Sequence, residues 1–131
     1  MKQSNNMKHK IISILLLLAS VFSFAQTPQG IDYQAVARDE AGQPLQNQQI
    51  SLRISILSSA TNGELLYSET HTLTTNEMGL LHLTIGAGTP ETNIFSGIGW
   101  AKGSEKWLQV EMDTQAGTNY KIYGTQKLLS V

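Results

Sequence analysis

Acid–base chemistry in this sequence would have to come from a small set of side chains around Glu69 and His71. The two residues are two positions apart, so in a β-strand they lie on the same face and predict a hydrogen-bonded pair. One interpretation is an acid–base couple, and the other is a polar pair that satisfies itself at the margin of the core, which is the commoner arrangement. We expect the second, so replacing His71 by Ala should lower stability more than any activity.

Metal binding and nucleophilic catalysis have little support. His82 is predicted to lie on the opposite face of a hairpin from His71, which disfavours a shared metal site or a two-histidine relay. The sequence has no cysteine, and none of its serines lies in a Gly-x-Ser-x-Gly elbow. The cluster Asp39-Glu40-Ala41-Gly42 lacks the alternating oxygen ligands of a calcium loop, and Gly86-Ala87-Gly88 does not open a helix that would cradle a phosphate. We therefore expect a protein that is not an enzyme and that has no cofactor or metal.

Aromatic side chains give the one defined hypothesis for binding. Trp107 is predicted to point outward from its strand, and Tyr120 and Tyr123 lie near the end of a sheet, so these three predict a stacking surface for sugar rings. Trp100 lies in a loop and is a further candidate for a ligand surface, because loops often carry binding residues. Packing in the core or at its rim is the alternative for all four.

The element that positions most of these residues is the stretch from Leu65 to Gly86, which we predict to be a long β-hairpin. Gly79 is expected in the left-handed conformation of a three-residue loop, so that Leu73 faces Leu83 and His71 faces Ile85. Side chains then alternate with a period of two, and one face is apolar while the other is wet. The apolar face would carry Tyr67, Glu69, His71, Leu73, Leu81, Leu83 and Ile85.

The remaining strands follow from alternating apolar residues between turn signals. We expect strands over 31–38, 49–58 and 106–113 and one or two short closing strands over 119–131. The irregular segment from Ala87 to Glu105 predicts one helical turn, capped by Thr92 or Asn93, that presents Ile94, Phe95 and Ile98. About seven short strands predict an all-β fold, an Ig-like or prealbumin-like antiparallel sandwich.

The N-terminus has the pattern of a signal peptide. Three lysines precede an apolar run from Ile11 to Phe24, and Ala25 ends a plausible cleavage site, so residues 1–25 predict a leader helix and residues 26–131 a single domain. The alternative is an amphipathic or membrane-anchored N-terminus. The segment from Gln26 to Val131 has six Lys and Arg against ten acids, a net charge of −4, which argues against nucleic-acid binding. We expect an exported protein that meets the membrane only during export.

Several motifs resemble the N-terminal β-domain of a family of exported Gram-negative bacterial proteins. They are Pro28 to Asp39 (PQGIDYQAVARD), Ser51 to Leu57 (SLRISIL), Tyr67 to His71 (YSETH), Thr74 to Asn76 (TTN) with Gly79-Leu80, and Leu128 to Val131 (LLSV). Members of that family typically continue into tail-fibre-like, collagen-like or self-cleaving regions. The resemblance implies a head or spacer of a surface fibre, with no catalytic residue to carry over. The strand–turn rhythm is more weakly similar to bacterial immunoglobulin-like and carboxypeptidase-regulatory-like modules.

These observations favour a structural or assembly module over a catalyst. The chain stops at Val131 within an apolar, strand-like run, so we expect a continuation beyond it, the alternative being a docked last strand. The expected partners are a downstream domain of the same polypeptide or other surface proteins. A carbohydrate- or protein-binding adhesin module, with a glycan as ligand, is the alternative function.

Overall fold

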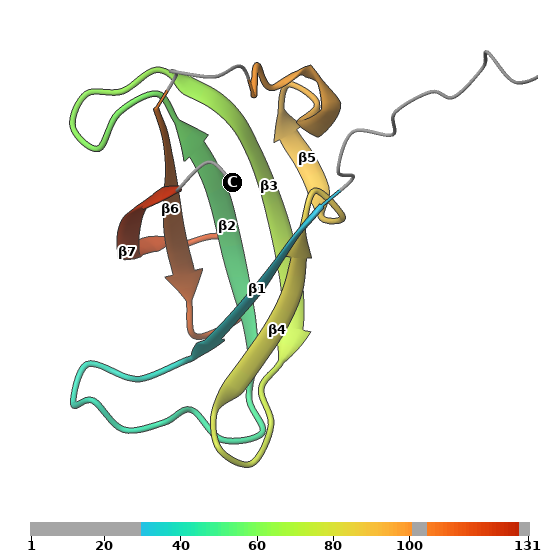
Figure 1. The fold of residues 1–131 in the computed structure, drawn as a ribbon. Coiled ribbons are helices and arrows are strands. Elements are labelled where there is room, and N and C mark those ends of the chain that lie inside the picture. The colour runs from blue at the N-terminus through green and yellow to red at the C-terminus, as the bar shows by residue number, and fades with distance from the viewer. Residues whose placement is uncertain (1–29, 101–104, 129–131) are drawn as a thin grey trace, which may run out of the picture.

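The computed structural model describes residues 30–100 and 105–128, and this part of the chain is built almost entirely from β-strands. The strands are β1 (Ile31–Val36), β2 (Gln49–Leu57), β3 (Leu65–Thr74), β4 (Leu80–Ile85), β5 (Thr89–Thr92), β6 (Lys106–Asp113) and β7 (Lys121–Leu128), and a 3-10 helix, η1, spans Phe95–Gly97. They form two antiparallel sheets, ordered β5-β3-β2-β6-β7 and β1-β4 (Figure 1). The predicted all-β sandwich of seven strands is confirmed, whereas the predicted leader over residues 1–25 lies outside the described residues.

The core lies between the two sheets and follows from the alternation of each strand. Leu52, Ile54 and Ile56 on β2 have no exposed surface, and β6 and β4 contribute inward-facing residues in the same way. These side chains are branched or long aliphatic groups that suit a pleated surface. The core contains Ala37, Ile50, Leu52, Ile54, Ile56, Tyr67, Leu81, Leu83, Ile85, Ile98, Leu108, Val110 and Met112.

The predicted hairpin pairing of β3 with β4 is wrong. β3 pairs with β2 and β5, while β4 pairs with β1, so Leu83 lies opposite Tyr33 in its sheet and Leu73 lies opposite Ile50 in the other. The predicted faces are nevertheless confirmed, because Leu81, Leu83 and Ile85 are buried. Two strands that are each apolar on one face can bury those faces in two ways. They can pair side by side in one sheet, or they can lie in two sheets that face each other across the core, as β3 and β4 do. The turn between β3 and β4 therefore carries the chain from one sheet to the other.

That turn is held by the side chain of Asn76. Its Oδ1 accepts hydrogen bonds from the amides of Met78 and Leu80, both at 2.9 Å, and Gly79 has the predicted left-handed backbone with φ +78°. The amide of Ala37, just after β1, donates to the Gly79 carbonyl at 2.8 Å. The turn is thus joined to the connection between β1 and β2, at the lower end of the molecule in Figure 1.

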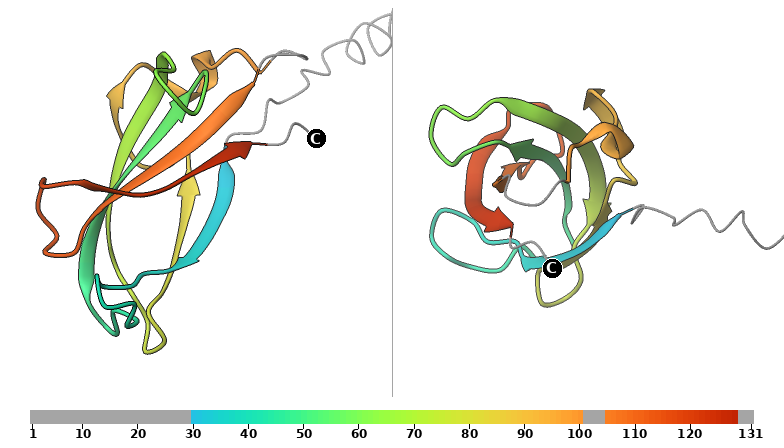
Figure 2. Two further views of the ribbon diagram at one scale, coloured as in Figure 1. Left: turned by 90° about the vertical axis from the view of Figure 1, so that its left-hand side faces the viewer. Right: turned by 45° about the horizontal axis from the view of Figure 1, so that its top comes forward.

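The sheets are unequal, and this leaves one flank open. The smaller sheet has two strands and the larger has five. All residues of β7 from Lys121 to Lys127 are exposed, and only Leu128 is half-buried. Figure 2 shows β7 curling toward β1, and no strand in the described part of the chain pairs with either one there. We call the space between these two strands the open flank.

The segment between β4 and β6 differs from the prediction in two ways, by an additional strand and by the capping of its helical turn. Residues 89–92 form β5, an edge strand that the sequence did not predict. The helical turn is present as η1, but its N-cap is Ile94 without a side-chain cap, because Thr92 ends β5 and Asn93 instead donates to the Leu66 carbonyl at 3.0 Å. Among the described residues no helix is both long and apolar enough to cross a membrane.

Candidate functional site

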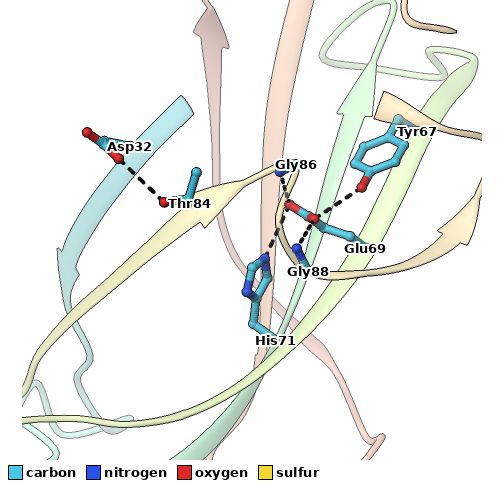
Figure 3. Close-up of polar contacts among 7 residues, drawn as sticks. All are labelled: Asp32, Tyr67, Glu69, His71, Thr84, Gly86 and Gly88. Atoms are coloured by element: carbon cyan, nitrogen blue, oxygen red, sulfur yellow. Dashed lines mark hydrogen bonds and ion pairs between the residues drawn. The ribbon is translucent and has the colours of Figure 1, made fainter. Parts of the chain in front are cut away.

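The most connected polar group in the interior is the carboxylate of Glu69 on β3. Glu69 has no exposed surface. Its Oε1 accepts a hydrogen bond from the Gly86 amide at 2.7 Å, and its Oε2 accepts from the Gly88 amide at 2.7 Å and from the Tyr67 hydroxyl at 3.1 Å. The Nε2 atom of His71 is buried and lies 3.2 Å from Oε1 (Figure 3). The structure brings Glu69 and His71 together as predicted, at ion-pair distance and inside the core, but the Nε2 atom of His71 makes no hydrogen bond.

Local sequence explains this arrangement. Tyr67, Glu69 and His71 alternate along β3 and so share its inner face. Gly86 has a positive φ of 103°, and the turn that it makes after β4 points two amides at the carboxylate. A Cβ on Gly88 would lie only 2.7 Å from Glu69 Oε2, so glycine is required for this approach. The glycine-rich turn is thus an anion-binding turn, and the anion is the protein's own side chain.

The electrostatics favour the ionised form of this carboxylate. Burial by itself would raise the pKa of Glu69, but the contact with His71 and the two glycine amides outweigh it and hold that pKa below its ordinary value. Burial first, and then the neighbouring Glu69 carboxylate, raise the pKa of Tyr67 to about 12. Because both oxygens are occupied and the group is sealed from solvent, the arrangement ties β3 to the turn after β4 and presents no free atom to a substrate.

The two histidines occupy different environments. His71 faces the core, whereas the His82 side chain is 55% exposed and its Nε2 lies 4.0 Å from the Asp32 carboxylate. The predicted inward and outward orientations are therefore confirmed, but the two residues lie on strands of different sheets and not on the two faces of one hairpin. Within the described ranges, no group of three or more His, Cys, Asp or Glu side chains could hold a metal ion.

The four predicted aromatic residues fall in three places. Trp100 contacts Phe95 with its ring tilted by 55° and the ring centroids 5.7 Å apart, and Phe95 in turn meets Tyr67 edge-on at 5.5 Å. Trp107 is half-buried on the outer face of β6, where its cross-strand neighbours are Leu57 and Lys127. Trp100 therefore belongs to the end of the sandwich, and Trp107 to the larger sheet.

Tyr120 and Tyr123 face different sides of the larger sheet. The Arg53 guanidinium lies 4.7 Å from the centroid of the Tyr120 ring and makes a two-point ion pair with Glu111 at 2.7 and 2.9 Å. Tyr123 instead reaches toward the smaller sheet, where its hydroxyl donates to the Val36 carbonyl at 2.6 Å. A single stacking platform built from Trp107, Tyr120 and Tyr123 does not form.

A hollow of about 460 Å³ opens where β1 ends opposite the start of β7. Met112, Ile122 and Tyr123 supply its apolar lining. Its polar lining comes from the residues after β1 and from the β6–β7 connection, namely Arg38, Asp39, Glu40, Asp113, Thr114, Gln115, Asn119 and Lys121. A volume of this size lies in the range of ligand-binding clefts. The sequence analysis missed this site because strands far apart in the chain build it.

The charged groups at the hollow are already engaged. The Asp113 carboxylate accepts from the amides of Gln115 at 2.9 Å and Asn119 at 3.0 Å, and the Gln115 amide is the main reason that the pKa of Asp113 is lowered. Lys121 lies 3.6 Å from the Glu40 carboxylate. These contacts order the two connections that border the hollow.

Comparison with known proteins yields one match. A family model described as a domain of unknown function, DUF8740, matches residues 32–125. This range begins in β1 and ends in β7, so it includes residues of every strand of the sandwich. No curated protein and no solved structure matches the chain.

Proposed function

This chain belongs to the DUF8740 family, and we propose that it is a non-catalytic assembly module of an exported bacterial surface protein. In this role the sandwich is the N-terminal head or spacer of a longer, fibre-like protein, and it acts through packing and strand contacts. Its partners are a downstream domain of the same polypeptide or other surface proteins.

The observation that carries the proposal is the open flank. A two-stranded sheet faces a five-stranded one, and β7 is exposed along nearly its whole length. Ile122 on β7 is 67% exposed and Tyr123 beside it is 39% exposed. An exposed edge strand presents unpaired backbone groups that can pair with another chain, and natural proteins usually cover or interrupt such edges.

The placement at the cell surface has a different support. The lysines before the apolar run that ends at Phe24 have the order of a signal peptide, and the motifs from Pro28 to Asp39 and from Leu128 to Val131 resemble those of exported Gram-negative surface proteins. The buried Glu69 clamp is consistent with a structural role, because both oxygens of its carboxylate accept hydrogen bonds within the fold.

The test is site-specific photo-crosslinking in cells that export the protein. A photoreactive residue at position 122 on β7 should give covalent adducts of higher mass in the cell envelope. The matched control is position 94, because Ile94 is the same residue type, is 64% exposed and follows β5 at the opposite edge of the larger sheet. Adducts formed equally at both positions, or at neither, would contradict the proposal.

A carbohydrate-binding module is the second candidate. The exposed Tyr123 ring beside the hollow favours it, because aromatic faces stack on sugar rings. Glycan-array binding by the exported protein tests it, with Trp107→Ala and Tyr123→Ala as variants. Binding that either substitution abolishes without unfolding the domain would replace the assembly role by this one.

A further inference from the structure

The smaller sheet is incomplete on the side of β1. On β4, the inward-facing Leu81, Leu83 and Ile85 are at most 5% exposed. Their cross-strand partners on β1, which are Ala35, Tyr33 and Ile31, also pack against the core but are only half-buried. Burial therefore decreases from β4 to β1, which is the gradient expected where the next strand of a sheet is lacking.

The backbone edge of β1 points into the open flank. The Val36 carbonyl, at the end of β1, accepts its hydrogen bond from the Tyr123 side chain of β7 at 2.6 Å. A side-chain hydroxyl thus satisfies an acceptor at a place where a neighbouring strand would donate an amide. Burial, and then the electrostatic effect of Tyr123, raise the pKa of Tyr33 on β1.

The chemistry of the flank fits a polypeptide better than a small charged ligand. At the hollow, Arg38 donates to the Gly42 carbonyl at 2.9 Å, Asp39 accepts from the Ala41 amide at 2.9 Å, and Asp113 and Lys121 are engaged as described above. The uncharged polar residues Thr114, Gln115 and Asn119 complete the lining of the hollow. What the flank offers a polypeptide is a backbone edge and the apolar groups of Met112, Ile122 and Tyr123. These are the two elements of strand addition, in which the main chain gives affinity and pockets accept alternate side chains.

We propose that the open flank accepts an extended strand from a partner polypeptide, which pairs with the free edge of β1 and completes the smaller sheet. Its inward residues are apolar at alternate positions, to cover Ile31 and Tyr33 and to fill the hollow. Its outward residues include basic ones, because the described residues contain ten acids and five Lys and Arg. This inference rests on the proposed assembly function and identifies the contact by which it occurs.

The experiment uses the 131-residue chain, exported and purified as the cell processes it. Fluorescence anisotropy compares the binding of two labelled peptides of about twelve residues, which is enough to span a strand of ordinary length. In one peptide valine alternates with lysine or threonine, and in the other the same residues are grouped in blocks. The alternating peptide should bind at least ten-fold more tightly. Hydrogen exchange should show that bound peptide slows exchange of β1 amides that exchange fast in the free protein, while amides of β5, at the far edge of the larger sheet, are unchanged.

Substitutions at the flank sharpen the test. Tyr123→Phe removes the hydroxyl that occupies the Val36 carbonyl and should increase affinity several-fold, whereas the control Tyr120→Phe, on the outer face, should leave it unchanged. Ile31→Lys places an inward-pointing charge on the edge strand and should abolish binding. If that variant fails to fold, the two tyrosine variants and the binding of the two peptides to the wild-type protein still test the proposal.

Three results would overturn the inference. The first is equal binding of both peptides, or binding without protection of β1. The second is protection of the β1 amides in the free monomer, which would mean that the chain's own segment fills the flank. The third is protection that appears only with concentration-dependent dimerisation, which would assign the flank to a second copy. Crosslinked adducts at position 122 without slower hydrogen exchange in β1 would support the assembly function but not this contact. Peptide binding to β1 without any crosslinked adduct in cells would support the contact but not the assembly function.

Discussion

Replacing Glu69 by glutamine tests whether the buried carboxylate holds the two sheets together. Glutamine has nearly the same shape, so the substitution removes the charge and one acceptor while leaving the packing almost unchanged. In the wild-type protein each carboxylate oxygen accepts from one glycine amide, both at 2.7 Å. The NH₂ group of the new side chain would meet one of those amides with a donor, which would leave a buried N–H without a partner.

The magnitude follows from the environment of the carboxylate. Hydrogen bonds to a charged group contribute about 1.5–3 kcal/mol each, and a buried donor left unsatisfied costs a further 1–3 kcal/mol or so. Losing one amide bond and weakening the contacts with Tyr67 and His71 should therefore lower the free energy of unfolding by about 3 kcal/mol or more. For a domain of this size, that corresponds to a fall in Tm of about 12–24 °C.

Thermal and urea unfolding of wild type, Glu69→Gln and the control Glu77→Gln provide the measurement. Glu77 is exposed in the turn between β3 and β4, so its substitution should change stability by less than about 0.5 kcal/mol. An equal urea m-value for the three proteins would show that the comparison concerns the folded state. A Glu69→Gln variant within about 1 kcal/mol of wild type would refute the reasoning that the carboxylate is a clamp.

Three further predictions follow from the same structure. Because the pKa of Glu69 is lowered in the folded state, the contribution of its charge to stability is fully present above the ordinary pKa of 4.5 and is lost as the pH falls through the folded-state pKa. The free energy of unfolding should therefore fall more steeply with acid in wild type than in Glu69→Gln. Parallel curves for the two proteins would argue against this linkage. In urea unfolding, Gly79→Ala should lower the free energy of unfolding by about 1–3 kcal/mol more than Gly42→Ala does. Both glycines have a positive φ, but a Cβ at position 79 would lie 2.9 Å from Pro44, whereas a Cβ at position 42 would meet nothing. Equal losses would show that backbone strain alone determines the effect. Mass spectrometry of the protein isolated from cells that produce it should find an N-terminus at Gln26, and an intact N-terminus at Met1 would remove the predicted leader.

The strands and their inner faces were predictable because alternation with a period of two is a local signal. The sequence from Lys106 to Asp113 predicts a strand with Leu108, Val110 and Met112 inward, and the structure has β6 at those bounds with those residues buried. The left-handed Gly79 was likewise predicted from its place in a turn between apolar runs. Local pattern therefore defined the elements and the residues that reach the core.

The pairing of strands was not predictable in the same way. The same alternating pattern fits two strands that pair as a hairpin and two strands that lie in facing sheets. The structure has the second arrangement, with β4 beside β1. The clamp at Glu69 carried a signal that could have been used, because a lone acid on an apolar face requires donors and Gly86-Ala87-Gly88 follows in the next connection. The open flank carried no such signal, since it depends on which strands are neighbours.

The pairing of β1 with β4 has a consequence for the order in which the chain can fold. Ile31 pairs with Ile85 and Val36 with Leu80, so β1 finds this neighbour only after the whole of β2 and β3 has appeared. Contacts of such separation close late and slow the folding of β-proteins. Through that interval β1 lacks the strand that pairs with it in the fold, and unpaired strand edges of this kind are prone to aggregate.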